Sequence, residues 1–479
     1  MAGIGFELRR VVRQGGALGF IGASLAGTVV VAGPWILSLL GIVLIQRYAG
    51  LALSESPALF TSTIVYSSAL SLVLFTGLHY VFSRQVSDLV YVHKDQEAGS
   101  ALLAFLLGTI ALACVLAAAG VLPLRVAGTT SRPGLFLLGA GLLFVGTSAN
   151  WVLMSFISLL RSYVGIFLAY LAGSLASFAG TFLLGRAYGT GGALLGYSVG
   201  QWVIVIILYG MTLESYRPAA VSLKGLMIYL RRYRLLFLAG ALYAGATWVD
   251  KIVFWFAFGT RVPGTWWRLY DRYDVPVFFS VLSLIPGLVY FTIETETAFY
   301  PRMREFLRSV SSDTFQRIQQ RKYAMIRSLT TGLRGQSVLQ GIVSLVLILA
   351  APTIGPFLFG PSLDVRALQV TLAAVFFHAL FLSLLIFLFY LELYGLAALS
   401  GLAFLVVNLA ASIAIVGISG AGISDAGNGD SRFLGVSYLL GAIAGCVVAG
   451  LSLARQVRRL DHILFIRATL ASPNDALRD

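Results

Sequence analysis

The chain has 479 residues, of which 58% are hydrophobic and only 11% are charged, and its mean hydropathy is +0.88. Soluble domains carry about 25% charged residues, so this composition excludes an ordinary soluble protein and predicts an all-α polytopic membrane protein. The net charge of +14 is gathered between apolar runs, which favours contact with anionic lipid over binding of nucleic acid. The two cysteines, Cys114 and Cys446, fall inside apolar runs, where we expect packing and no disulfide.

Apolar runs long enough to cross a bilayer as helices follow one another along the chain. There are twelve, at residues 17–46, 57–82, 98–122, 134–160, 164–186, 193–214, 235–258, 275–297, 335–358, 366–390, 395–418 and 434–454. No small-residue cleavage site interrupts the first run, so we expect a span there and not a cleaved signal peptide. With the N-terminus inside, most of the 34 Lys and Arg residues fall on the cytoplasmic side, which predicts that both termini are cytoplasmic.

The order of the spans predicts two lobes of six helices each. Gly-Ala-x-x-Ala-Gly recurs early in both lobes, at Gly22–Gly27 and Gly240–Gly245, which favours a duplication with the substrate pathway between the repeats. The basic cytoplasmic segments favour amphipathic helices that lie on the membrane or dock a partner. The predicted parts are a cytoplasmic amphipathic N-terminus (1–16), an N-lobe (17–214), a cytoplasmic connector (215–234), a C-lobe (235–454) with a cytoplasmic loop (302–334), and a cytoplasmic tail (455–479).

Asp250 and Lys251 are the only charges in the run 235–258. A charge at membrane depth costs about 2.5 kcal/mol or more on insertion scales, so it normally faces a partner or a wet cavity. We predict that Asp250 faces a central cleft as a substrate-binding or proton-coupling group, with Lys251 as its counter-charge or as a ligand. The alternative is that Lys251 snorkels outward and Asp250 compensates a neighbouring helix. Neighbouring side chains point about 100° apart on a helix, so the two need not pair with each other.

Four further residues are candidates for the same pathway: Trp35, Tyr243, Trp248 and Glu294. Aromatic rings suit the apolar faces of sugars, although aromatic side chains also fill helix packing and membrane interfaces. Glu294 lies near the cytoplasmic end of its span, where a solvated interfacial role is an equally good interpretation.

Proline and glycine interrupt two spans, at Gly33-Pro34 and at Pro286-Gly287. Because proline frees a carbonyl and kinks a helix, we predict hinges here, with static kinks as the alternative. The sequence has no nucleotide-hydrolysis motif, no His-Glu-x-x-His motif and no Cys/His cluster at metal-binding spacing. We therefore expect a protein that is not an enzyme and needs no cofactor or metal.

Three parts of the sequence resemble the PelG family of bacterial inner-membrane exopolysaccharide transporters: MAGIGFELRR at the start, AGPW at Ala32–Trp35, and the block Tyr273–Pro301. That family is similar to the multidrug/oligosaccharidyl-lipid/polysaccharide (MOP) flippases, so the resemblance implies twelve helices in two six-helix lobes around a central cavity. It also implies export of a nascent N-acetylgalactosamine-rich polysaccharide across the bacterial inner membrane. The partners that it implies are a cytoplasmic glycosyltransferase and a membrane complex regulated by cyclic di-GMP.

Two other functions fit the same features. One is an ion-coupled carrier of drugs or lipid-linked oligosaccharides with the same fold, in which Asp250 would be the coupling carboxylate. The other is a membrane scaffold whose basic loops recruit a glycosyltransferase. A carrier of a pyrophosphate-linked lipid would need several cations in its cavity, and Lys251 is essentially the only one at membrane depth.

Overall fold

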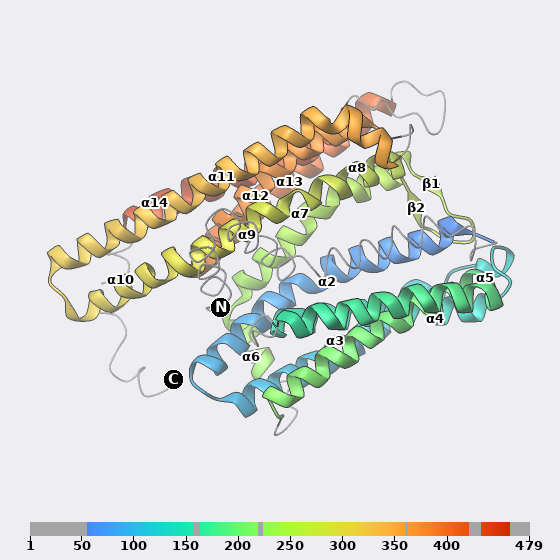
Figure 1. Ribbon diagram of the computed structural model, residues 1–479, viewed down its shortest axis with the longest axis horizontal. Helices are drawn as coiled ribbons and strands as arrows, with labels where there is room; N and C mark the ends of the chain where they lie inside the picture. The colour runs from blue at the N-terminus through green and yellow to red at the C-terminus, as the bar shows by residue number, and fades with distance from the viewer. Residues whose placement is uncertain (1–54, 158–162, 219–223, 360–362, 421–432, 460–479) are drawn as a thin grey trace. The chain divides into compact units, whose positions relative to one another are not determined.

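The computed structural model describes residues 55–157, 163–218, 224–359, 363–420 and 433–459. The first predicted span lies outside the described residues, and with it Trp35, Gly33 and Pro34. The described part is almost wholly helical, with one two-stranded antiparallel sheet (Figure 1). Ten of its helices are long and apolar enough to cross a membrane, which confirms the prediction of an all-α polytopic membrane protein.

The elements follow in chain order from the first described helix. They are α2 (Pro57–Tyr91), α3 (Asp95–Val121), the 3₁₀ turn η1 (Val126–Gly128), α4 (Pro133–Ile157), α5 (Tyr163–Ser215), α6 (Lys224–Arg232), α7 (Arg234–Phe258), β1 (Thr260–Arg261), β2 (Arg268–Leu269), α8 (Asp271–Leu282), α9 (Leu284–Glu294), the π-helical turn η2 (Thr295–Phe299), α10 (Tyr300–Ser312), α11 (Phe315–Phe359), α12 (Val365–Tyr390), α13 (Tyr394–Gly420) and α14 (Val436–Arg458).

The 53-residue helix α5 is a hairpin of two helices. The chain reverses at Tyr188 and Gly189, and Gly189 has φ 64° and ψ −152°, a conformation that glycine adopts at little cost. The hydroxyl of Ser177 donates to the carbonyl of Tyr197 across the hairpin over 3.0 Å. The predicted spans 164–186 and 193–214 therefore lie on either side of one tight turn. The total of twelve spans stays a prediction, because the first one lies outside the described residues.

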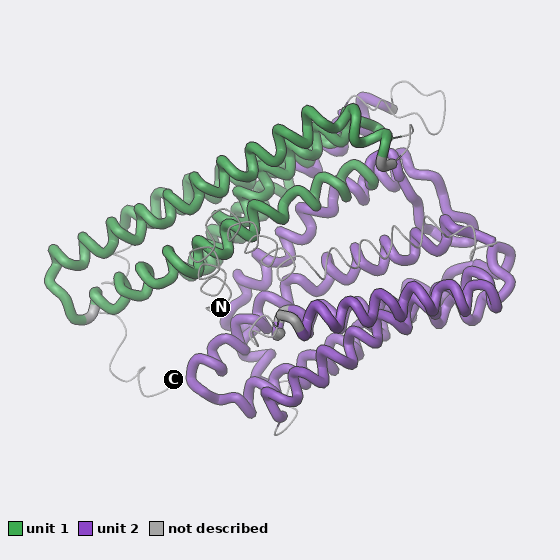
Figure 2. The backbone as a smooth tube through the Cα atoms, in the orientation of Figure 1, with its two compact units in different colours: residues 1–28, 275–407, 434–479 green, residues 29–274, 408–433 purple. Residues whose placement is uncertain are grey.

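The chain forms two compact units (Figure 2). Unit 1 comprises residues 1–28, 275–407 and 434–479, and unit 2 comprises residues 29–274 and 408–433. The chain therefore passes from one unit to the other within α8, after Asp274, and within α13, after Val407. The lobe boundaries predicted from the sequence stay a prediction.

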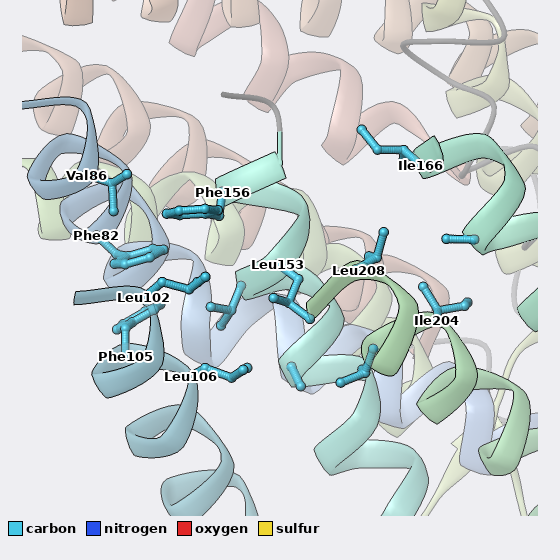
Figure 3. Close-up of a cluster of buried hydrophobic side chains, with 14 of the residues drawn as sticks. Phe82, Val86, Leu102, Phe105, Leu106, Leu153, Phe156, Ile166, Ile204 and Leu208 are labelled. Atoms are coloured by element: carbon cyan, nitrogen blue, oxygen red, sulfur yellow. The ribbon is translucent and has the colours of Figure 1, made fainter. Parts of the chain in front are cut away.

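Unit 2 has an aromatic core where α2, α3, α4 and α5 meet (Figure 3). The rings of Phe82 and Phe105 stack with their centroids 4.2 Å apart and their planes 13° apart, and Phe156 packs beside Phe82 at 6.4 Å. All three side chains are buried. Stacked aromatic rings at these distances add to the free energy gained from burial, so this cluster holds α2, α3, α4 and α5 together.

Unit 1 contains the helix break that the sequence predicts near Pro286 and Gly287. Pro286 has no N–H to donate to the carbonyl four residues earlier, and the helix is interrupted at Ser283, between α8 and α9. The fully buried Gln340 of α11 donates its amide to the Ser283 carbonyl over 3.0 Å. The break is therefore filled by a side chain, and its motion as a hinge stays a prediction.

The predicted basic loop 302–334 consists of α10 and the first part of α11, which run side by side as a hairpin (Figure 1). Arg321 pairs with Asp313 at 3.2 Å, and Phe306 and Met325 are buried. The helix α11 continues without a break from this hairpin into the apolar segment.

Candidate functional site

Asp250 lies inside α7, and its side chain is fully buried. The hydroxyl of Tyr273, in α8, donates to the Asp250 Oδ2 over 2.5 Å. The amide of Asn408, in α13, donates to the Oδ1 over 3.3 Å. Lys251 Nζ lies 3.3 Å from both carboxylate oxygens. One buried carboxylate thus accepts hydrogen bonds from residues of three helices, all of them in unit 2. A buried charge is tolerated only with such partners.

Lys251 turns back along its own helix toward the carboxylate. Its Nζ donates to the Thr247 carbonyl over 2.8 Å. It also lies 5.8 Å from the ring centre of Trp248 and 6.0 Å from that of Tyr273, distances at which an ammonium is attracted to an aromatic face. Only 8% of Lys251 is exposed. The pairing with Asp250, which the sequence left open, is present in the structure.

A second carboxylate belongs to the same cluster. Asp274, in the first turn of α8, accepts a hydrogen bond from the indole N–H of Trp255 over 2.7 Å. Its other oxygen, Oδ1, is buried and has no hydrogen-bond partner among the described residues. Lys251 attracts Asp274 electrostatically as well, so one ammonium serves two carboxylates. We call Asp250, Lys251, Tyr273, Asp274 and Asn408 the carboxylate network.

Sequence reasoning singled out Asp250 and Lys251 but left Tyr273 and Asp274 out of the site. Both precede the predicted span 275–297, where polar residues are ordinary and give no signal. Asn408 could have been found, since an amide inside a spanning helix needs a partner.

Aromatic side chains of unit 2 adjoin the network. The ring of Trp255 lies 4.7 Å from that of Tyr66, in α2, and 6.2 Å from that of Trp248. Tyr66, Trp255 and Trp266 line a hollow together with apolar side chains of α2 and α7. The predicted pathway residue Trp248 therefore lies beside the carboxylate network.

The remaining predicted residues lie elsewhere. Tyr243 is half-buried on α7, beside Tyr80. Glu294 belongs to unit 1, where it is half-buried at the end of α9 and packs over Gly332 of α11. The π-helical turn η2, which follows Glu294, buries Glu296. Such turns are often found at functional sites, and no pattern in the sequence predicts this one.

The chemistry available to the carboxylate network is the binding of a proton or a cation and the exchange of hydrogen bonds. It contains two carboxylates, one ammonium, a phenol and an amide. Within the part of the chain that the structure describes, no three His, Cys, Asp or Glu side chains gather as a metal site.

The fold defined by these helices is that of the MOP flippases. It is similar to a MATE transporter in the straight conformation, with a TM-score of 0.59 and 13% identity over 91% of this chain and 96% of that one. A eukaryotic MATE transporter gives 0.56 and 14% identity over 92% and 99%. The lipid II flippase MurJ, in an inward closed conformation, gives 0.53 and 13% identity over 94% of each chain.

The family is more specific than the fold. Residues 1–465 match the family model described as "PelG: Putative exopolysaccharide Exporter (EPS-E)". The chain therefore belongs to the PelG family of exopolysaccharide exporters, as the sequence resemblance implied, and it is a multi-pass membrane protein of polysaccharide transport. No curated protein matches the chain.

Proposed function

We propose that this protein moves a nascent, N-acetylgalactosamine-rich polysaccharide across the bacterial inner membrane as the transport subunit of a synthase complex. Membership of the PelG family supports the substrate class. The observation that carries the mechanism is the fully buried Asp250, held by donors from α7, α8 and α13. A buried, fully bonded carboxylate in a spanning helix is costly and marks a functional position.

In this proposal Asp250 and Lys251 couple helix positions to transport and do not touch the sugar in the conformation described. Asp250 is 0% exposed, so a polymer cannot reach it without helix movement. Trp248 and Tyr243, which are half-buried on the same helix, offer aromatic faces to sugar rings. Trp35 and Glu294 complete the proposed pathway, and the pairs Gly33-Pro34 and Pro286-Gly287 act as its hinges.

We further propose that both termini are cytoplasmic, that the basic segments contact anionic lipid, and that the protein has no catalytic activity of its own. A cytoplasmic glycosyltransferase and a membrane receptor for cyclic di-GMP would supply the polymer and its control. The buried carboxylates favour a second candidate, an ion-coupled carrier of lipid-linked oligosaccharides or drugs, because such carriers need an ionisable group in the membrane.

The test is complementation of a deletion strain with wild type, Asp250→Asn and Asp88→Asn. Asp88 is the matched control, since its side chain is 34% exposed and pairs with Arg84 at 3.1 Å on the surface of α2. We expect loss of secreted polymer in the Asp250→Asn strain, with normal secretion in the control and unchanged drug tolerance after deletion.

Co-purification of the glycosyltransferase separates the alternatives. If assembly survives Asp250→Asn while secretion stops, a pure scaffold is excluded. If secretion and assembly both survive, the assignment of Asp250 to the transport mechanism is wrong. If deletion lowers drug tolerance and leaves secretion intact, the second candidate replaces the first.

A further inference from the structure

The carboxylate network contains more negative charge than its donors compensate. Among the described residues, Asp250 and Asp274 are two carboxylates, and Lys251 is the ammonium that attracts both. A net negative charge in a buried cluster is unfavourable unless another positive charge enters. The network therefore has a place for one more cation.

The two carboxylates differ in how many donors they have. Asp250 accepts hydrogen bonds from Lys251, Tyr273 and Asn408. Asp274 accepts one side-chain hydrogen bond, from Trp255, and its Oδ1 is buried without a partner in the described chain. A proton placed on this oxygen displaces no existing hydrogen bond. As a residue Asp274 is only half-buried, which leaves a route for the proton.

We propose that the carboxylate network binds one exchangeable proton on Asp274, and that this makes the transporter responsive to the proton gradient. Proton binding forms an O–H bond at Oδ1 and brings the network to neutrality, with Lys251 left to balance Asp250. The role of this proton in export rests on the proposed function, whereas the binding of the proton to Asp274 does not.

Asp271 and Tyr66 are further titratable groups near Asp274. Asp271 lies one turn earlier on α8 and is exposed, and it adds negative charge. Tyr66 of α2 is the neighbouring phenol, and its hydroxyl already bonds the backbone of Arg268. Neither group supplies the missing positive charge. The proton therefore binds to one of the two carboxylates, that of Asp274.

A second buried oxygen without a partner lies in the same network, on the residue that bonds Asp250. The amide oxygen Oδ1 of Asn408 is also buried without a hydrogen-bond partner among the described side chains, and Asn408 is 0% exposed. Its amide nitrogen bonds Asp250, so the amide oxygen is free to accept a hydrogen bond if the groups of the network rearrange. Asp274 and Asn408 are the residues at which the chain passes between the two units.

The experiment uses the full-length protein, purified in lipid nanodiscs without polysaccharide. Proton uptake is counted with a pH indicator, and tryptophan emission is followed during the titration because the Trp255 indole bonds Asp274 directly. We expect wild type and the surface control Asp88→Asn to take up one more proton per chain than Asp274→Asn over the same pH range. The histidines and the surface carboxyls titrate in all three proteins, so their uptake cancels in this difference.

Two further measurements keep the result decisive. Infrared difference spectra of wild type should show a carboxylic acid forming over the same range, which needs no variant to fold. Trp255→Phe removes the donor to the ionised form, so its midpoint should move to higher pH while one proton is still bound. Uptake that persists unchanged in Asp274→Asn, or wild type without a carboxyl signal, overturns the proposal. Loss of export with proton binding intact would count against the proposed function and not against the proton site.

Discussion

Asn408 and Asp250 lie 158 residues apart in the sequence, yet the Asn408 amide donates a hydrogen bond to the Asp250 carboxylate over 3.3 Å. The same amide nitrogen lies 2.9 Å from the Ala246 carbonyl, one turn earlier on α7. Asn408 thus joins α13 to α7 at two adjacent turns. Since the carboxylate has no contact with water, its stability depends on partners of this kind.

Asp250→Asn should destabilise the protein by about 3–5 kcal/mol, because it leaves the buried Lys251 without its nearest counter-charge. The double variant Asp250→Asn/Lys251→Met should lose less, since no unpaired ammonium remains. The free energy of unfolding can be measured in mixed lipid–detergent micelles. Asp88→Asn, which breaks a surface pair, should cost at most about 1 kcal/mol. Equal losses in the single and double variants would show that Lys251 does not depend on Asp250.

Gly196→Ala should disrupt the hairpin of α5. A Cβ at Gly196 would run into the backbone of Gly180 on the opposite helix, and overpacking of this kind costs about 1–3 kcal/mol. Gly210→Ala is the matched control in the same helix, because a Cβ there meets nothing within 4 Å. The control should be neutral or gain up to about 1 kcal/mol from higher helix propensity. Unfolding of both variants under one condition compares them directly, and a stable Gly196→Ala protein would contradict the close contact.

Glu55 should make the stability of unit 2 depend on pH. Its carboxylate accepts hydrogen bonds from the Thr130 hydroxyl and from the backbone N–H groups of Ser131 and Thr190, over 2.9, 3.0 and 3.2 Å respectively. Partial burial raises the pKa of Glu55, but hydrogen bonds from these three residues together outweigh it, so the pKa lies below its ordinary value.

A carboxyl whose pKa is lowered by folding stabilises the protein above its unfolded pKa, and this stabilisation is lost as the pH falls through the folded pKa. Glu55→Gln should therefore lower the unfolding temperature at neutral pH, and the difference from wild type should shrink in acid. Glu97→Gln is the control, because Glu97 only pairs with Lys94 on an exposed surface at 3.0 Å. A difference that is independent of pH would rule out the charge of Glu55 as its cause.

Gln340→Ala should cost about 0.5–1.5 kcal/mol, because it removes the buried hydrogen bond from the Gln340 amide to the Ser283 carbonyl at the helix break. Gly287→Ala should also destabilise, since its methyl group would overlap the Gln340 side-chain oxygen. The double variant should lose less than the sum of the two single losses, because the smaller side chain makes room for the methyl group.

The control for this cycle pairs Gly287→Ala with Gln369→Ala. Gln369 bonds the Ile348 carbonyl over 3.0 Å, away from the break, so the two losses should add. Unfolding free energies of all five variants give both coupling energies. A zero coupling between Gly287 and Gln340 would mean that the two residues do not share the same space.

Hydropathy predicted where the chain crosses the membrane but not where its helices end. The span predicted to end at residue 82 continues as α2 to Tyr91, helped by the Arg84–Asp88 pair at i and i+4. The span predicted from residue 335 begins as α11 at Phe315. Apolar runs indicate where a helix contacts lipid, but the hydrogen bonds of a helix continue into water. Hydropathy therefore did not predict the polar ends of these helices.

The candidate site was predictable only in part for a related reason. Asp250 and Lys251 are identified from the sequence alone, because they are two charges inside an apolar run. Tyr273 and Asp274 stand at the border of a span, where polar residues need no explanation, and only the fold brings them to Asp250. The unpartnered oxygen of Asp274 is a property of three-dimensional packing, and no spacing in the sequence reports it.

The uninterrupted helix α11 has 45 residues, which makes it about 68 Å long at 1.5 Å per residue. That is more than twice the roughly 30 Å of the hydrocarbon core, so a large part of it stands in water as a rod. The rod carries the basic hairpin near one end and Gln340, the residue that fills the helix break, farther along. A partner that pushed or pulled on the hairpin would therefore move Gln340 with it, because a continuous helix joins the two.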